Sequence, residues 1–495
     1  MIESNIKKLW DGVQDLVNLK ILDLCESKQL TELPDFSRAH NLEVVVLYEC
    51  LSLRSVHPSI LSLHSLEQLD VSHCGKLESL ESETHLESLS ELNVEGCVSL
   101  KKFCLSSEKL DSIDLEDCVK VEKLQVLPMG GFTKLRRLVI EDGERLRSLP
   151  IRELCGLTNL EEFKIRNFQQ EINTGEMRSL FDAWHNLKEL HLDSWSKLSE
   201  IPDNIKALSS LKHIFLTNCQ GLKSILGLPP SLQELDARDC TSLEIVFSDS
   251  LVRNWCQFDF KNCIKLKEDS IHFIGELLTH FSLTSTCKDG LSYGAGARYP
   301  GSRVPKWIAY KQITEPSNAI EFTCNLERSP RLLFCCVVPH HLSYRDDFFC
   351  DFSYDDKNKF HRTSYFSWDN EDFYPEEMNS DHVVLWHMRG CSFGAEKGDD
   401  ANSSCKFYME CWNDDRRCLE EVPIKACGVH VTYMLESDST EERVPPTKKQ
   451  KTFRYLPTSQ LNPTNQFQDD IICHPLQLKF IRKSKQKRLP YIQFL

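Results

Sequence analysis

Apolar residues in the first half of the chain recur at offsets 0, 3, 5 and 8 of a repeating unit, with polar residues between them. In one unit they are Leu42, Val45, Leu47 and Cys50. Apolar positions that alternate with polar ones predict a short strand that is buried on one side. A further apolar residue at offset 11 predicts a returning segment. The pattern begins at eleven positions: Leu19, Leu42, Leu66, Leu89, Leu110, Leu135, Leu160, Leu187, Leu211, Leu232 and Trp255.

Successive units begin 21 to 27 residues apart, and their consensus L-x-x-L-x-L-x-x-C is that of a leucine-rich repeat. A unit of this size cannot bury its own leucines, so neighbouring units must stack to form a core. We therefore predict that residues 1–266 form an α/β leucine-rich-repeat solenoid, a horseshoe of about eleven repeats. In the longest unit, a polar insert at Gln169–Arg178 predicts that the solenoid bends or widens there. Four units lack Cys at offset 8 and carry Ser27, Gly143, Phe168 and Trp195 there.

The repeat ends near residue 266, and the pattern then changes. Residues 267–298 are predicted to form a helical connector and hinge, with an amphipathic helix at Ser270–His280. Short aromatic and β-branched runs in residues 299–436 predict an all-β jelly-roll or sandwich domain. The charged, proline-containing residues 437–495 are predicted to be a disordered tail. The expected strands of the β domain are Ala319–Cys324, Leu332–Val338, Phe348–Tyr354, His382–His387, Cys405–Cys411 and Ala426–Met434.

Composition narrows the function classes. The net charge is −15 and the pI is about 5.6, which argues against a general nucleic-acid-binding protein because such a protein needs a basic surface. The longest strongly apolar run, Leu332–Val338, is too short to span a membrane. Seven of the 22 cysteines stand at offset 8. Cysteines at equivalent positions of stacked units behave as small buried apolar residues, so we predict a reducing compartment.

Charged residues gather at offsets 1, 2, 4, 6 and 7, which face the concave side of a horseshoe or its edge. The units that begin at Leu66, Leu89 and Leu110 carry only acidic residues there, and basic residues enter in the next units. Such a surface can attract a complementary partner, although charges at strand edges can also serve solubility alone. We expect a binding role for the acidic block as a whole. The candidate partner-binding residues are Glu67, Asp70, Glu91, Glu95, Asp111, Asp114, Glu116, Asp117, Arg136, Arg137, Lys164, Arg166 and Lys188.

Several motifs resemble those of one protein family. In order along the chain, they are Asn5–Trp10 (NIKKLW), Tyr299–Trp307 (YPGSRVPKW), Ala319–Phe322 (AIEF), Leu333–Val338 (LFCCVV), Asp381–Trp386 (DHVVLW) and Lys425–His430 (KACGVH). The set resembles the leucine-rich repeats and the post-repeat jelly-roll domain, C-JID, of plant TIR-NB-LRR (TNL) disease-resistance receptors. Ile6, Leu9 and Trp10 are similar to the end of an earlier repeat, so we expect the chain to be the C-terminal part of a larger protein or a short form.

The resemblance implies that the chain is the recognition module of an intracellular plant immune receptor. In this family the repeats and the jelly roll recognise a pathogen effector, which releases a nucleotide-binding switch and lets TIR domains consume NAD. The expected partners are an effector or the nucleotide-binding domain of a receptor, with oligomers only in a full receptor. The alternatives are a stand-alone adaptor or decoy that binds a full-length receptor, or an NAD-cleaving TIR receptor if the missing domains precede the chain.

No catalytic, cofactor or metal site is predicted. The chain contains no G-x-x-x-x-G-K-[ST] motif and no TIR segment, so we expect it not to be an enzyme. Gly294-Ala295-Gly296 lacks the spacing of a nucleotide loop and is interpreted as the hinge. The gaps between Cys405, Cys411, Cys418 and Cys427 do not match a zinc site.

Basic clusters mark the tail. Lys448, Lys449 and Lys451 fit a short nuclear-import signal, and Arg482–Arg488 is a second cluster. Short basic runs are also common in solvated tails. The expected location is therefore the cytoplasm, with entry into the nucleus left open.

Overall fold

The computed structural model describes residues 3–82, 84–126, 134–249, 252, 256–284, 295–313, 319–325, 331–340, 347–354, 360–367, 378–387, 400–410 and 424–433. The basic clusters of the tail and Trp255, the first residue of the last repeat, lie outside these ranges. No helix in the described residues is long and apolar enough to cross a membrane.

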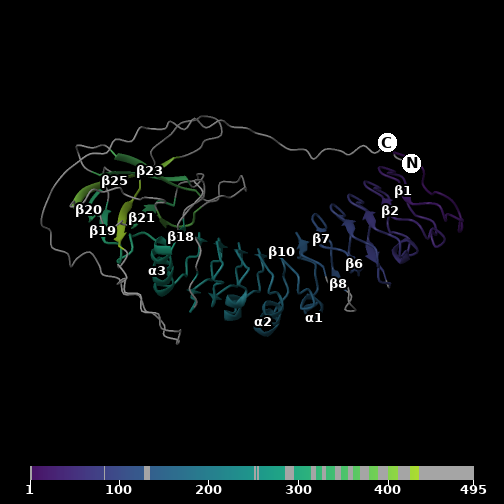
Figure 1. Ribbon diagram of the computed structural model, residues 1–495, viewed down its shortest axis with the longest axis horizontal. Coiled ribbons are helices and arrows are strands. Elements are labelled where there is room, and N and C mark those ends of the chain that lie inside the picture. Colours follow the sequence, from purple (N-terminus) through teal and green to yellow (C-terminus); the bar gives the residue numbers. More distant parts are fainter. Residues whose placement is uncertain are drawn as a thin grey trace, which may run out of the picture.

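The repeats form a curved solenoid whose concave face is built from parallel strands (Figure 1). Each of the expected strands is present and starts two residues after the first apolar residue of its unit. Neighbouring strands pair so that offset 3 lies beside offset 3, for example Leu22 with Val45 and Val45 with Leu69. The strands are β1 (Ile21–Asp23), β2 (Val44–Val46), β3 (Gln68–Asp70), β5 (Glu91–Asn93), β7 (Ser112–Leu115), β9 (Arg137–Ile140), β10 (Glu162–Ile165), β11 (Glu189–His191), β13 (His213–Phe215), β15 (Glu234–Asp236) and β17 (Gln257–Asp259).

Shorter elements cover the convex side. Two small parallel sheets lie there, and α1 and α2 occupy the middle of the array (Figure 1). The polar insert of the longest repeat forms much of α2, whose first turn is held by a capping box between Asn173 and Glu176. The convex elements are β4 (Ser79–Glu81), β6 (Lys102–Leu105), β8 (Lys123–Val126), β12 (Glu200–Ile201), β14 (Ser224–Ile225), β16 (Ile245–Val246), α1 (Ile151–Leu154), α2 (Thr174–Ala183), η1 (Ile60–Ser62) and η2 (Asp203–Ala207).

The cysteines at offset 8 link each repeat to the one before it. Cys97 is fully buried, and its Sγ donates a hydrogen bond to the carbonyl of Val71 at 3.1 Å. All seven offset-8 cysteines bond in this way to the offset-5 carbonyl of the preceding repeat, at 3.0 to 3.3 Å. Burial raises the pKa of Cys97 to about 12, so the thiol keeps the proton that it donates. Trp195 stands at offset 8 of its unit in place of Cys. Its Nε1–H donates a hydrogen bond to the carbonyl of Ile165 in the preceding repeat at 2.5 Å.

The residue before each of these positions has a left-handed backbone in most repeats. At offset 7, φ lies between 54° and 60° in Glu26, Glu49, His73, Asp117, Asn167, Ser194, Asn218, Asp239 and Asn262. Gly96 has φ 70°, and a Cβ there would lie 2.3 Å from Nδ1 of His73. This conformation turns the chain out of the strand, and it directs the N–H of His73 to the carbonyl of Glu95 in the next repeat at 2.7 Å.

Beyond the repeats, the concave sheet continues into the C-terminal strands. The helix expected at Ser270–His280 is present as α3 (Glu268–Thr284). β18 (Gly296–Pro300) pairs in parallel with β17 and antiparallel with β24 (His382–His387). β21 (Arg331–Val338), β26 (Ala426–Thr432) and β19 (Tyr310–Ile313) follow, so that a single sheet runs from β7 to β19. A second antiparallel sheet contains β20 (Ala319–Asn325), β25 (Asp400–Glu410), β22 (Asp347–Tyr354) and β23 (Phe360–Ser367).

These strands match the all-β expectation, while the jelly-roll topology and the boundaries at 266, 298 and 436 stay predictions. Residues 296–298, which the sequence placed in a connector and hinge, lie in β18. They are held there because Arg298 pairs with Asp259 of the last repeat at 2.5 Å. Nε2 of His382 also accepts a hydrogen bond from the N–H of Asn262 at 3.0 Å.

Candidate functional site: the concave face

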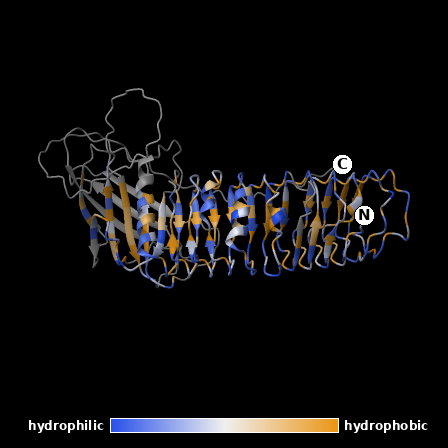
Figure 2. Ribbon diagram, turned by 90° about the horizontal axis from the view of Figure 1, so that it is seen from below, coloured by the Kyte–Doolittle hydropathy of each residue, from blue (hydrophilic) through white to orange (hydrophobic). Residues whose placement is uncertain are grey.

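The concave face is lined by side chains at offsets 2 and 4 of each strand and at offset 6 just after it. Side chains at offsets 3 and 5 point the other way and are buried in the core. Polar and apolar residues are therefore mixed along the whole array of repeats, as the hydropathy colours show (Figure 2). Of the predicted residues, eight lie on this face: Asp70, Glu91, Glu95, Asp114, Glu116, Arg137, Lys164 and Arg166. The other five lie at its edges, with Glu67, Asp111, Arg136 and Lys188 before their strands and Asp117 in a left-handed turn after one.

The acidic segment comprises Asp70, Glu91, Glu95, Asp114 and Glu116 on and after β3, β5 and β7. Asp70 and Asp114 also brace the chain locally, because Oδ1 of each accepts the N–H two residues on, at 2.9 and 3.1 Å. Glu91, Glu95 and Glu116 are exposed. Partial burial, followed by the charges of Asp114, Glu141 and Glu95, raises the pKa of Glu116. Like charges therefore crowd at this segment and give it a negative potential.

The mixed segment, on and after β9, β10 and β11, neutralises itself. Arg137 bridges Asp114 at 2.5 Å and Glu162 at 2.9 Å. Lys164 contacts Glu141, and Arg166 lies between Glu141 at 3.2 Å and Asp193 at 3.5 Å. The basic residues that the sequence offered to a partner thus face acids of neighbouring strands of the same chain. At the edge of the face, Glu161 similarly forms salt bridges with Lys188 at 2.6 Å and with Arg136 at 3.9 Å.

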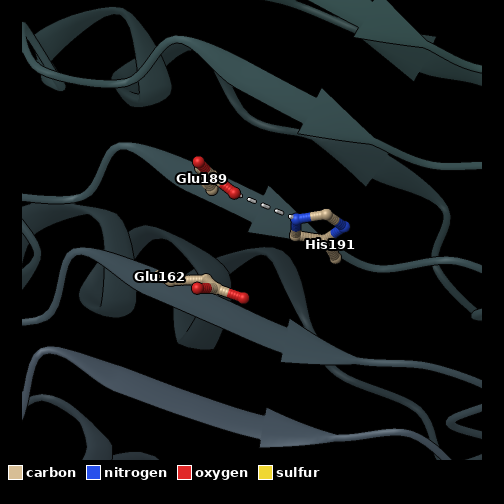
Figure 3. Close-up of side chains that lie close together, drawn as sticks. All are labelled: Glu162, Glu189 and His191. Carbon is tan, nitrogen blue, oxygen red and sulfur yellow. Dashed lines mark ion pairs between the residues drawn. The ribbon is translucent and has the colours of Figure 1, made fainter. Parts of the chain in front are cut away.

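A histidine cluster that the sequence pattern did not predict lies on the next strands. The ring of His191 stacks on Phe215 with centroids 4.3 Å apart, and His213 pairs with Glu234 at 3.2 Å. Nε2 of His191 lies 3.6 Å from a carboxylate oxygen of Glu189 (Figure 3). The His191 ring is the largest cause of a lowered pKa at Glu189. The available signal was the pair of histidines at offsets 4 and 2 of successive units.

The face ends in buried charges. Asp236 pairs with Arg238 at 2.8 Å, and Asp259 pairs with Arg298. All four side chains are almost fully buried. Burial raises the pKa of Asp236 to about 6 against the opposing effect of Arg238, whereas Arg298 overcomes burial and lowers the pKa of Asp259. This network joins the last two repeats to β18 and therefore anchors the C-terminal strands.

Two protein-family models match the repeats of this chain. The model described as "Plant disease resistance protein RPS2-like, leucine-rich repeats" matches residues 105–260, and the model "Zer-1-like, Leucine-rich repeats" matches residues 11–112. Among solved structures, the functional domain of InlJ from Listeria monocytogenes, which includes a cysteine ladder, is 18% identical with a TM-score of 0.23. It covers 53% of this chain and 61% of that chain.

Two relatives from Arabidopsis thaliana share more of the sequence. The disease resistance protein RPP5 is 26% identical over 90% of this chain and 32% of its own length. The disease resistance protein RML1B is 34% identical over 54% of this chain and 23% of its own length. The chain thus spans about a third or less of these relatives. It is related to the disease resistance proteins of plants, and the similarity includes its leucine-rich repeats.

Proposed function

We propose that the chain is the recognition module of a plant immune receptor and that its concave face binds a protein partner. The observation that carries this proposal is the acidic segment. Among the described residues, the salt bridges that reach it are His73–Glu95 at 4.0 Å and Arg137–Asp114. The mixed segment beside it pairs its charges internally. An uncompensated acidic face attracts a basic surface and accelerates its association. The partner is a pathogen effector or the nucleotide-binding domain of a receptor, with a basic contact surface.

The C-terminal strands take part in this recognition. β18 and β24 extend the same sheet, and the Asp259–Arg298 pair holds them to the last repeat. A partner that lies along the concave face therefore meets repeats and C-terminal strands as one rigid surface. The resemblance of this chain's C-terminal motifs to the C-JID domain of plant TNL receptors supports this joint role.

The test uses binding of the full chain to panels of pathogen effectors and of nucleotide-binding domains from plant resistance proteins, followed by charge reversal. The face variant carries Glu91→Lys, Glu95→Lys and Glu116→Lys. The control variant carries Glu87→Lys, Glu108→Lys and Glu153→Lys on the returning outer segments, so both change the net charge equally. We expect the face variant to weaken binding at least about tenfold and the control less than about twofold. Equal losses of affinity in both variants would show that binding depends on the net charge of the chain and not on the concave face.

We also propose that the chain has no enzymatic activity of its own and acts in the cytoplasm. Both family models that match it describe leucine-rich repeats. Incubation of the chain with NAD and with ATP should give no turnover and no retained nucleotide. A fluorescent fusion of the chain, with and without Lys448→Ala, Lys449→Ala and Lys451→Ala, would reveal whether the tail directs part of the protein to the nucleus.

A further inference from the structure

We propose that Glu162, Glu189 and His191 bind a divalent transition-metal ion, Zn²⁺ in particular, on the concave face. Glu162 and Glu189 occupy offset 2 of β10 and β11 and are direct neighbours in the sheet register. His191 follows two residues after Glu189 and faces the same side. One ligand atom from each residue lies within 4.8 Å of the other two, and Figure 3 shows the three side chains turned toward one another.

His191 supplies the second observation. Its Nε2 is buried and has no hydrogen-bond partner among the described residues, although Glu189 lies 3.6 Å away. Buried polar atoms of native proteins normally have a partner. The stacked ring of Phe215, at an interplanar angle of 18°, fixes the plane of the imidazole and holds this nitrogen on the carboxylate side. A metal ion between the three donors would satisfy the nitrogen.

The donor set suits zinc. Zn²⁺ accepts imidazole nitrogen and carboxylate oxygen at about 2.0 to 2.2 Å, and sites with three protein ligands keep a fourth position open. The three donors have to move together slightly to reach such distances, which the half-exposed glutamate side chains permit. Mg²⁺ and Ca²⁺ favour oxygen ligands, so the imidazole selects against them. The open position faces the concave side, where water or a donor of a bound protein can enter.

Arg137 fits as the outer support of this site. Its Nε donates to Oε2 of Glu162 at 2.9 Å, which orients the carboxylate and leaves its other oxygen for the ion. Ligand carboxylates and imidazoles are usually held by such neighbours. The site does not depend on the proposed partner, because all three ligands come from this chain.

The experiment is a Zn²⁺ titration of the full chain by calorimetry, with Co²⁺ as a spectroscopic probe. His191→Gln and Glu189→Gln remove ligands. His185→Gln and Glu161→Gln are matched controls, since both residues lie in the same repeat as Glu162 but outside the cluster. We expect one bound ion to be lost or weakened about 10- to 100-fold in each ligand variant and to be unchanged in the controls. Other zinc-binding groups, such as exposed thiols, contribute equally to all variants.

Two further readouts keep the outcome unambiguous. Circular dichroism and thermal unfolding without metal verify that each variant is folded. Added Zn²⁺ should raise the melting temperature of the wild type and the controls but not of the ligand variants. The part of the cobalt spectrum that the ligand variants lose should lack the thiolate charge-transfer band, since none of the ligands is a cysteine. Equal zinc stoichiometry and affinity in wild type and ligand variants, or a thiolate band from the ion that they lose, would overturn the proposal.

Discussion

The acidic and mixed segments of the concave face have the same backbone but opposite electrostatic design. In both, carboxylates stand at offsets 2 and 6 of strands with the same register, and the acidic segment adds Asp70 and Asp114 at offset 4. In the mixed segment Glu141, Glu162 and Asp193 each meet a Lys or Arg of a neighbouring strand. Glu91 and Glu116 of the acidic segment form no such pair among the described residues. The fold therefore fixes where side chains point and leaves their charge free. The shortage of internal ion pairs distinguishes the acidic segment from its neighbour.

The buried end of the face gives the largest expected effect. Arg298→Met should lower the free energy of unfolding by about 3 to 5 kcal/mol, because it leaves Asp259 as a buried carboxylate with a broken pair. Arg136→Met, at an exposed edge pair, should cost less than about 0.5 kcal/mol. Urea-induced unfolding measures both. Similar losses would remove the distinction between buried and exposed pairing.

The junction should also respond to pH. Burial lowers the pKa of His382 to about 4, while an unfolded histidine titrates near 6.5. The unfolded chain therefore binds this proton first as the pH falls, so His382 by itself lowers the stability by ~3 kcal/mol between pH 6.5 and pH 4. The raised pKa of Asp236 acts in the opposite direction over the same range, so the measurement compares variants. In urea-induced unfolding the wild type should lose more stability than His382→Gln between these two pH values. The exposed His64, replaced in His64→Gln, serves as the control and should leave the pH dependence intact.

The cysteine bonds test whether the acidic segment and the C-terminal end of the array share one scaffold. Cys97→Ala should destabilise the chain by about 1 to 2 kcal/mol, through the lost sulfur contacts and the carbonyl left without its donor. Cys240→Ala, near the C-terminal end of the array, should cost about the same, since its bond to Leu216 is equivalent. Val98→Ala, at an exposed site, should change little. A large difference between the two cysteine variants would show that the scaffold is not uniform.

The smallest effect should come from Arg137. Arg137→Ala frees Asp114 and Glu162, so the acidic segment extends into the mixed one. Binding of an oligolysine peptide at low salt should strengthen by about two- to threefold and lose this gain at high salt. Fluorescence anisotropy of a labelled peptide measures it. If the affinity for the peptide does not change, Arg137 does not limit the extent of the acidic surface.

Local spacing predicted the repeats well, because one offset pattern specifies both the strand and its buried side. It also explained the offset-8 cysteines as packing residues, although not their hydrogen bonds to the preceding repeat. The ion-pair partners could not be read from the sequence, since Arg137 can reach acids on two neighbouring strands and the rotamer decides. The hydrogen bond between Asn262 and His382 joins residues that are 120 positions apart, so no local sequence pattern predicts it. The strand of Gly296 was missed because small residues resemble a loop.

The bonds between offset 8 and the preceding offset 5 have a consequence for how such a chain can change. Each bond involves two adjacent units and uses the same atoms in all seven units that carry Cys at offset 8. Gain or loss of one whole unit by recombination therefore recreates a compatible joint, whereas insertion of part of a unit does not. The concave surface can thus be lengthened, shortened or reordered in steps of one repeat. New combinations of concave side chains then arise without a new fold.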